Sequence, residues 1–582
     1  DPASPGVGYA DSQAVKNALQ LYGKAAFRTE MRLGADTWNT VQRIYGALQE
    51  ANGENRLRAT TVILGKGLWT RWFWDRLPSL FLFRPALLFS FPLATLIHLP
   101  SARLRVNSLQ RTLVRRGPAP RAITRDPRVS ILRDEHGVVG ILEADRKFNT
   151  LLVGSQGAGK STDLQNIIWV DSHGTVGGDW GKALVVLDIG KDTAKRALGM
   201  VPADREVIWF DPGDPDCPWT LNPLLTVDDN AVLADHVLAG LTEVFGEDAI
   251  RFRSREFLGN AIVAVRDVHG DQADFTHVYK LLTDADYRQD VIDRVQDEHQ
   301  RRYWQGTFTQ AMANNPRFLD EGLAAPRNKL DEVLRNPHIR ATLETGHGRR
   351  LLDFRAIIAG RQVLLCNLDK SRLGDVGARL LGVLMLTMLW QALEAQNVVE
   401  EAQRVPVSLV IDEAQNFLAE GFLDLLAEGR AYGAQVTLAV RFLGEIESDK
   451  VIQGLQALAQ NLIVHQFELL DEAEVFMKRF MRVYANMVQV TAESQDAINF
   501  GADDFMRLPK FYAVCRFMAN GQVQPAFLAQ TLRWEDRYDA EAAKIHRERP
   551  EWAAPPGGRA STAAPPSPPL RVLPPTPPAP SA

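Results

Sequence analysis

Residues 148–161 read FNTLLVGSQGAGKS, and this stretch decides the fold class. The apolar run Phe148–Val153 predicts a buried strand, and residues 163–170 can continue as a helix. Between them, Gly154–Ser161 fits the pattern G-x-x-x-x-G-K-[ST], which forms a phosphate-binding loop when a strand precedes it and a helix follows it. In another context the same residues would be only a glycine-rich turn. The sequence therefore predicts a site for a nucleoside triphosphate.

The loop residues have separate expected roles. Gly157 and Gly159 allow backbone N–H groups to curl around phosphate oxygens, and the helix that follows adds its positive end. Lys160 is expected to reach the β- and γ-phosphates of ATP, and the Ser161 hydroxyl is expected to hold Mg²⁺. The expected nucleotide-binding residues are Gly154, Ser155, Gln156, Gly157, Ala158, Gly159, Lys160, Ser161 and Thr162.

Length and composition indicate a folded protein of several domains. The chain has 582 residues, and 46% of them are hydrophobic and 24% charged, which is typical of soluble globular proteins. The net charge is −5, so any contact with nucleic acid must come from local basic patches. Cys217, Cys366 and Cys515 lie far apart without metal-ligand spacing, which argues against a structural zinc site.

Strand-like and helical segments alternate on both sides of a long helical stretch. This alternation predicts an α/β fold with a doubly wound, mainly parallel sheet. Residues 129–142 resemble a hairpin that leads into the loop, and Asn520-Gly521 marks a second hairpin. Residues 227–343 are helical in pattern and would be an insertion in the nucleotide-binding domain. The other strand-like runs are 184–188, 207–210, 363–367, 407–411, 436–440 and 462–467.

The run Val407–Glu413, VSLVIDE, is a buried-strand pattern that ends in two acids. In a phosphate-loop enzyme such a pair faces the lysine of the loop: Asp412 would bind Mg²⁺, and Glu413 would polarise the attacking water. Apolar strands often end in Asp-Glu for structural reasons alone, but here the phosphate loop lies upstream. The two motifs together predict both halves of an ATP site.

With these motifs the chain resembles the TraG/TraD-type coupling proteins of conjugation and type IV secretion, within the FtsK/HerA class of ring-forming DNA motors. The resemblance covers about residues 130–530. The segments that carry it are Gly154–Ser161, Phe210–Pro212, Asn222–Leu224, Leu352–Arg355, Leu380–Gly382, Ile411–Phe417 and Leu426–Gly433.

The resemblance implies a RecA-like P-loop NTPase with an inserted all-α domain, using ATP and Mg²⁺. It also implies hexameric rings with ATP at the subunit interfaces. Such a ring would move DNA, without regard to its sequence, towards a secretion or conjugation channel, with relaxosome or channel proteins as partners. The alternatives are a soluble HerA-like motor in DNA processing or phage defence, and a non-motor ring that recruits substrate proteins.

Two arginines have positions that the resemblance makes notable. Arg430 matches the arginine finger that completes a neighbouring subunit's site, although it could instead pair with a carboxylate of its own subunit. Arg441 follows the next strand, where the family usually carries a glutamine that senses the γ-phosphate. Arg441 could still contact phosphate, or it could be an ordinary salt-bridge partner.

The amino-terminal part matches the family only in bearing a hydrophobic segment. Residues 67–99 hold a tryptophan cluster and the apolar run Leu77–Leu99, which Arg84 and three prolines interrupt. Residues 103–128 are rich in arginine. This pattern predicts attachment to the cytoplasmic face of the plasma (inner) membrane, peripheral or shallowly inserted. The alternative is a helical domain packed on other subunits of a cytoplasmic protein.

Other charged residues are weaker candidates. Asp188, Lys191 and Asp192 could border the nucleotide, but a capped strand-to-helix turn explains them equally well. A group of arginines in the helical insertion could touch DNA phosphates, or it could be a solvated helix face. This group is Arg251, Arg253 and Arg255.

The expected domain organisation has six parts. They are a flexible amino terminus (1–30), an amino-terminal helical or membrane-associated region (31–128), the first part of the nucleotide-binding domain (129–226), an all-α inserted domain (227–350), the second part of the nucleotide-binding domain (351–535) and a Pro/Ala-rich disordered tail (536–582).

Overall fold

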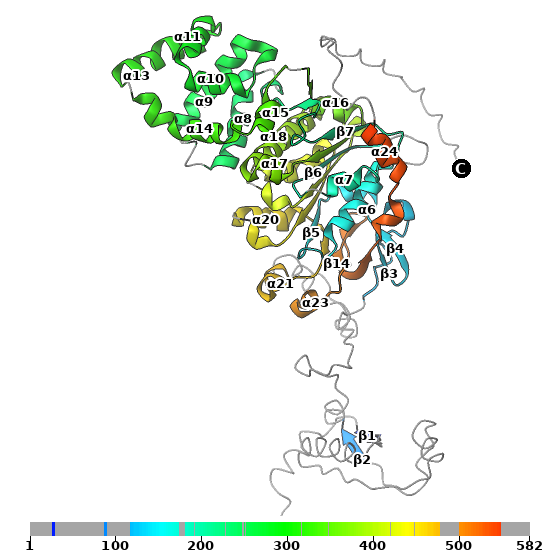
Figure 1. The fold of residues 1–582 in the computed structure, drawn as a ribbon. Helices are drawn as coiled ribbons and strands as arrows, with labels where there is room; N and C mark the ends of the chain where they lie inside the picture. The colour runs from blue at the N-terminus through cyan, green and yellow to red at the C-terminus, as the bar shows by residue number, and fades with distance from the viewer. Residues whose placement is uncertain are drawn as a thin grey trace, which may run out of the picture. The chain divides into compact units, whose positions relative to one another are not determined.

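The computed structural model divides into two compact units, Asp1–Thr112 and Leu113–Ala582, and Figure 1 shows the ribbon. The structure describes residues 26–29, 86–89, 117–173, 181–190, 192–226, 229–246, 250, 252–315, 317–346, 348–418, 421–446, 448–477 and 500–548.

In the amino-terminal unit the described residues form two short strands, β1 (Ala26–Thr29) and β2 (Ala86–Phe89). They pair antiparallel, with Ala26 opposite Phe89. Strand β2 lies inside the apolar run Leu77–Leu99. The rest of that run and the tryptophan cluster before it lie outside the described residues, so the expectation of membrane attachment stays a prediction.

The second unit is built on an 11-stranded sheet with the order β4-β3-β17-β14-β13-β5-β12-β11-β6-β10-β7. Every neighbouring pair from β13 to β7 is parallel, which confirms the predicted α/β fold with a mainly parallel sheet. The parallel strands are β5 (Thr150–Val153), β6 (Ala183–Asp188), β7 (Val207–Phe210), β10 (Val363–Asn367), β11 (Val407–Asp412), β12 (Ala434–Val440) and β13 (Asn461–Val464).

An antiparallel extension continues the sheet beyond β13. Both predicted hairpins form: β3 pairs with β4, and β15 with β16 around Asn520-Gly521, which have φ values of 53° and 73°. Positive φ at both positions fits a two-residue hairpin turn. The strands concerned are β3 (Ser130–Asp134), β4 (Gly137–Gly140), β14 (Tyr512–Arg516), β15 (Met518–Ala519), β16 (Gln522–Val523) and β17 (Phe527–Thr531), and a separate parallel pair joins β8 (Trp219–Thr220) to β9 (Arg350–Leu351).

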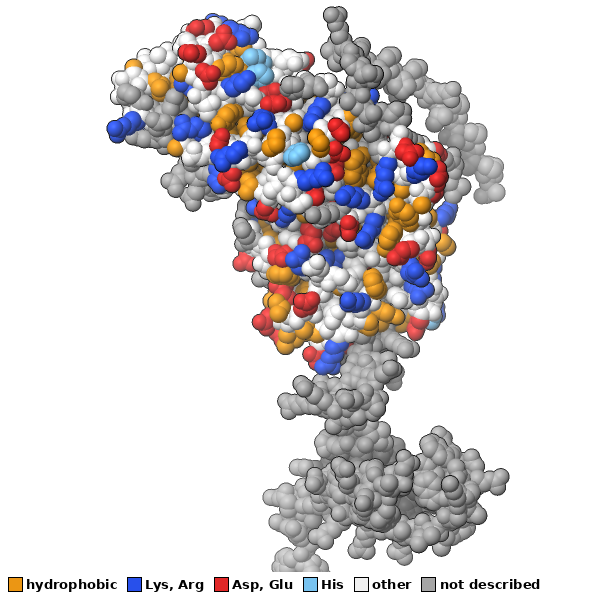
Figure 2. Space-filling model, viewed as in Figure 1, with side chains coloured by type: hydrophobic (Ala, Val, Ile, Leu, Met, Phe, Trp, Pro, Cys, Tyr) orange, Lys and Arg blue, Asp and Glu red, His pale blue; other side chains and the backbone are white. Residues whose placement is uncertain are grey.

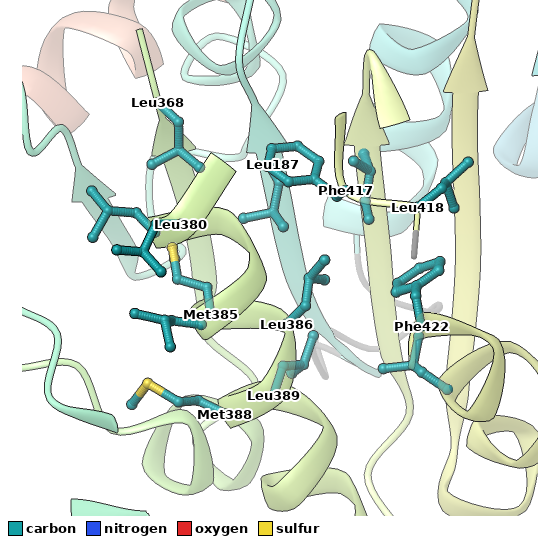
Figure 3. Packing of buried hydrophobic residues seen from close by; sticks show 14 of the residues in the cluster. Leu187, Leu368, Leu380, Met385, Leu386, Met388, Leu389, Phe417, Leu418 and Phe422 are labelled. Carbon is teal, nitrogen blue, oxygen red and sulfur yellow. The ribbon is translucent and has the colours of Figure 1, made fainter. Parts of the chain in front are cut away.

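Helices cover both faces of the sheet, because successive strand residues point to opposite sides. Leu151 belongs to one buried cluster and its neighbour Leu152 to the other. Figure 3 shows Leu386 and Leu389 of α18 (Asp375–Glu394) in the same buried cluster as Leu187 of β6. Helices α16 (Phe354–Ala359), α18, α19 (Phe422–Glu428) and α20 (Asp449–Leu458) contribute to the Leu151 cluster, and α6 (Lys160–Ser172), α7 (Thr193–Ala197) and α24 (Ala540–Glu548) contribute to the Leu152 cluster.

Helix α18 is a long apolar helix that packs in the Leu151 cluster. Among the described residues, Asp375–Val398 is the one helical stretch long and apolar enough to cross a membrane. However, 78% of its apolar window is buried inside the unit. Its side chains pack on the sheet and on Phe417, so we interpret it as a core helix.

The described elements between residues 229 and 346 are helical, as the pattern predicts. Trp304 is fully buried there and makes an edge contact with Phe257, with ring centroids 5.3 Å apart. Helix α8 packs on α18 and so connects this region to the sheet. The helices are α8 (Asn230–Phe245), α9 (Phe252–His269), α10 (Phe275–Thr283), α11 (Ala285–Arg294), α12 (Glu298–Arg302), α13 (Thr309–Asn314), α14 (Phe318–Leu334) and α15 (Pro337–Leu343).

Two expected boundaries are wrong. The strand expected at 462–467 ends at Val464, and the next residue, His465, lies close to Gly154 and Gly159 of the phosphate loop. The disordered tail expected from 536 begins too early: α24 is helical, and its residues Ala542 and Ala543 are buried. The remaining short helices are α5 (Glu143–Arg146), α17 (Lys370–Leu373), α21 (Leu470–Phe476) and α23 (Ala502–Met506).

Candidate nucleotide-binding site

The loop between β5 and α6 has a backbone that depends on glycine. Gly154 and Gly159 have φ values of 151° and 135°. A Cβ at Gly154 would lie 2.5 Å from Cβ of His465, and one at Gly159 would lie 2.9 Å from Cε1 of the same ring. The N–H of Ser155 donates to the carbonyl of Gln466 at 2.8 Å, which fixes the start of the loop.

Helix α6 begins at Lys160, inside the motif, so its positive end faces the loop. Gln156 and Gly157 are exposed at the tip, while Ala158 is buried. Ser161 and Thr162 are half-buried in the first turn. The predicted nucleotide-binding residues therefore lie together, in the loop and the first turn of α6.

Lys160 is buried, with only 7% of its surface exposed. Its Nζ donates to the carbonyl oxygens of Gly154 at 2.5 Å and Ser155 at 3.1 Å. Burial lowers the pKa of Lys160, and the nearby carboxylates of Glu413 and Asp412 act in the opposite direction. A phosphate group at the loop would supply the negative charge that a buried ammonium needs.

Asp412 ends β11 and lies opposite the first turn of α6. Its Oδ2 accepts hydrogen bonds from Ser161 Oγ at 3.1 Å and from Thr193 Oγ1 at 2.6 Å. Burial raises the pKa of Asp412, and the bonds from Thr193 and Ser161 oppose this shift. Hydroxyl and carboxylate oxygens from two elements suit Mg²⁺, which prefers oxygen ligands and keeps several waters. The residues present therefore fit the predicted ion.

Glu413 follows directly, in a left-handed backbone conformation with φ 50°. This conformation is uncommon for a residue with a Cβ, and such outliers are frequent at functional sites. Its N–H donates to Asp412 Oδ1 at 2.9 Å, and its Oε2 accepts from Gln415 Nε2 at 2.6 Å. The backbone and the side chain of Glu413 are therefore both held within this turn, beside Asp412.

Arg441 follows β12, the strand between β5 and β11. Its guanidinium lies 3.4 Å from Glu413 Oε2 and 3.7 Å from Glu445 Oε1. The side chain is 38% exposed, so the pairs are loose and partly solvated. Arg441 also lies close enough to Lys160 to oppose its charge. The structure thus places this arginine within the group of site residues.

Arg430 lies at the opposite end of β12. It is exposed, in the short helix η8 (Gly429–Tyr432), and its guanidinium is 4.5 Å from the ring centroid of Phe148. Phe148 precedes β5, whose other end carries the phosphate loop. The seven residues of β12 separate Arg430 from that end by about 20 Å. Arg430 therefore cannot reach the phosphate loop of its own subunit.

Three site residues were not expected from the sequence. Thr193 shares Asp412 with Ser161. His465 is fully buried and its Nε2 lies 2.8 Å from Oδ2 of Asp163 on α6, beneath the loop. Phe511 donates its N–H to the carbonyl of Ala158. None belongs to a motif, since each acts through a contact between distant segments.

The weaker candidates divide between structural roles and exposed positions. The carboxylate of Asp188 accepts from the N–H groups of Gly190 and Ala194, as in a capped strand-to-helix turn. Arg253 and Arg255 are exposed on α9, whereas Lys191 and Arg251 lie outside the described residues. On the face in Figure 2, acidic and basic side chains are interspersed. DNA contact on that face would therefore depend on small groups of cations.

Several solved structures resemble this chain at low sequence identity. The conjugative coupling protein TrwB, lacking its first 70 residues, is 14% identical with a TM-score of 0.48; the match covers 69% of this chain and 89% of that one. TrwB in complex with ADP and Mg²⁺ is 13% identical with a TM-score of 0.49, covering 73% and 96%. VirB4 of Thermoanaerobacter pseudethanolicus is 13% identical with a TM-score of 0.44, covering 70% and 98%.

TrwB belongs to the class that the sequence motifs resemble. No protein-family model matches the sequence, and no curated protein matches it. At these identities and TM-scores the likeness says nothing about activity.

Proposed function

We propose that the chain is an ATPase. The observation that carries the proposal is the convergence of three groups at the carboxyl ends of β5 and β11, the parallel strands on either side of β12. These groups are the buried Lys160, the hydrogen-bonded pair of Ser161 and Asp412, and the left-handed Glu413. Such a constellation binds a triphosphate and directs water at its last phosphorus.

Each residue has a defined task in that reaction. Lys160 exchanges its bonds to the loop carbonyls for oxygens of the β- and γ-phosphates. Ser161 and Asp412 would hold Mg²⁺, which when bound neutralises charge on those oxygens. Glu413 accepts a hydrogen bond from the attacking water through Oε1, while Gln415 keeps its Oε2 oriented. The buried surroundings strengthen these electrostatic interactions.

We propose further that hydrolysis drives DNA translocation by a homomeric ring, most simply a hexamer, of the coupling-protein type. Support comes from the motif resemblance and from Arg430, which points away from its own site and so suits an interface with a neighbour. The alternative function, a non-motor ring, is favoured by Arg441, because Arg441 occupies the position where the family usually carries a glutamine that senses the γ-phosphate. The other alternative, a soluble HerA-like motor, would use the same ATP site.

Residues 67–128 would attach such a ring to the cytoplasmic face of the inner membrane, as their apolar and arginine-rich pattern predicts. Two of the arginines are engaged within the chain: Arg125 pairs with Asp134, and Arg128 pairs with Asp126. Membrane attachment would therefore depend on the arginines before them. We retain the six-part domain organisation as a proposal, with the tail beginning after α24.

DNA of arbitrary sequence is expected to stimulate ATP hydrolysis. A motor grips phosphates at every register, so binding should weaken steeply with salt and tolerate changes of sequence. The measurement is phosphate release with scrambled duplexes and single strands across a salt series. Lys160→Ala, which keeps the DNA surface but loses the main phosphate cation, provides the background.

Two outcomes would contradict a DNA motor. An active ATPase that no DNA stimulates would favour the non-motor ring. A preference for one short duplex that persists at high salt would indicate a specific DNA reader.

Arg441→Gln tests whether this arginine contacts the γ-phosphate. The substitution removes the charge near Glu413 and restores the side chain usual in the family. If Arg441 contacts the γ-phosphate, affinity for a non-hydrolysable ATP analogue should fall about ten-fold or more, while affinity for ADP stays unchanged. Equilibrium binding of both nucleotides is the measurement. Equal affinities of variant and wild type for the analogue would make Arg441 a salt-bridge partner of Glu413.

A further inference from the structure

Phe511 is an exposed aromatic residue beside the phosphate loop. Nearly half of its surface, 46%, is exposed. In contrast, most residues of the neighbouring strands β14 and β17 are buried. Its ring belongs to the turn that leads into β14, and its Cα lies 3.4 Å from the position a Cβ would take at Gly159. The backbone of Phe511 therefore lies against the phosphate loop, while its side chain is partly open to solvent.

The backbone of Phe511 is held firmly in an unfavourable conformation. Its φ is 66°, in the left-handed region that bulky residues rarely adopt. Its N–H donates to the carbonyl of Ala158 at 2.8 Å, and its carbonyl accepts from the N–H of Thr531 at 2.8 Å. The phosphate loop and β17 therefore fix the backbone from two sides, and only the side chain remains free. Strain of this kind is frequent at ligand clamps.

The strand order indicates which end of a nucleotide would lie near Phe511. Glu413 and Arg441, which suit the γ-phosphate, follow β11 and β12 on one side of β5. Strands β13 and β14 lie on the other side, and β14 is antiparallel, so its first residues lie at the same sheet edge as the phosphate loop. A triphosphate with its γ-phosphate beside Glu413 would therefore extend its ribose and base towards β14.

We infer that Phe511 forms one wall of a nucleobase subsite, with its ring stacking on the base. This inference depends on the proposed function, since it assumes a nucleotide in the loop. A phenyl ring offers no hydrogen bond, and every base has a face on which it can stack. Phe511 therefore supplies affinity for purine nucleotides in general and does not distinguish ATP from GTP.

Binding of ATP, GTP and tripolyphosphate, each with Mg²⁺, to the full chain tests the inference. Phe511→Ala and Phe511→Leu should each lower the affinity for ATP and GTP about ten-fold or more, because each substitution removes the aromatic face. Phe511→Tyr should retain wild-type affinity. Tripolyphosphate has no base, so its affinity should be the same in all variants. Phe252→Ala, at an exposed phenylalanine on α9, is the matched control.

The outcomes separate the subsite from the nucleotide site itself. Unchanged ATP affinity in the leucine variant would overturn the inference, and so would an equal loss for ATP and tripolyphosphate, because the ring would then only support the loop. Melting without nucleotide shows whether the alanine variant folds, and the leucine variant decides if it does not. A wild-type chain that binds neither ATP nor tripolyphosphate would instead contradict the proposed ATPase.

Discussion

Glu413→Gln is expected to leave MgATP bound while hydrolysis falls by about 10²- to 10⁴-fold, the usual contribution of a positioned general base. Glutamine has nearly the same shape and can adopt the same left-handed backbone. It cannot accept a proton from water, so the ATP-loaded state should accumulate. Phosphate release under single-turnover conditions, together with equilibrium ATP binding, measures both halves of this expectation.

The matched control is Glu445→Gln. Glu445 is the other carboxylate beside Arg441, at 3.7 Å, and it is 26% exposed, similar to Glu413. Among the described residues it makes no hydrogen bond to Lys160 or Asp412, although its charge raises the pKa of Lys160 as that of Glu413 does, so hydrolysis should stay close to wild type. Wild-type hydrolysis by Glu413→Gln would show that another residue polarises the water.

Much of the fold follows from local sequence patterns. The buried strand before Gly154 and the two acids at the end of β11 are each indicated by a pattern of only a few residues. Because both follow parallel strands of one sheet, their carboxyl ends must meet at the same edge. The pairing of Ser161 with Asp412 is therefore a consequence of two local signals and one topological rule.

Contacts between distant segments could not be predicted in this way. His465 reaches Asp163 on α6 across 302 positions of the chain, and nothing near His465 indicates that it ends its strand early. Phe511 meets Ala158 only because β14 runs antiparallel beside β13. Helix α24 has a weak apolar pattern of alanines, and its buried His546 lies against the carbonyls of Val201 and Pro202, which are distant in the sequence. Each case depends on tertiary packing, which overrides local preference.

Substitution of Arg430 should remove most hydrolysis without weakening ATP binding. An arginine that stabilises the charge of phosphoryl transfer contributes about 10³–10⁵ in rate. The rate of ATP hydrolysis by Arg430→Ala should therefore fall by a factor in that range. Arg404→Ala is the control, since Arg404 also lies over an aromatic ring, that of Tyr432, but bonds to carbonyls of its own chain. That variant should hydrolyse ATP at nearly the wild-type rate.

The position of Arg430 makes a stronger expectation possible. Because β12 separates it from its own phosphate loop, any catalytic role must be in a neighbouring subunit. Inactive Arg430→Ala subunits mixed with inactive Lys160→Ala subunits should therefore regain activity, since some interfaces then combine an intact loop with an intact arginine. Mass measurement shows whether mixed rings form. If they form and remain inactive, Arg430 has its role within its own subunit, where its described contact is with the ring of Phe148.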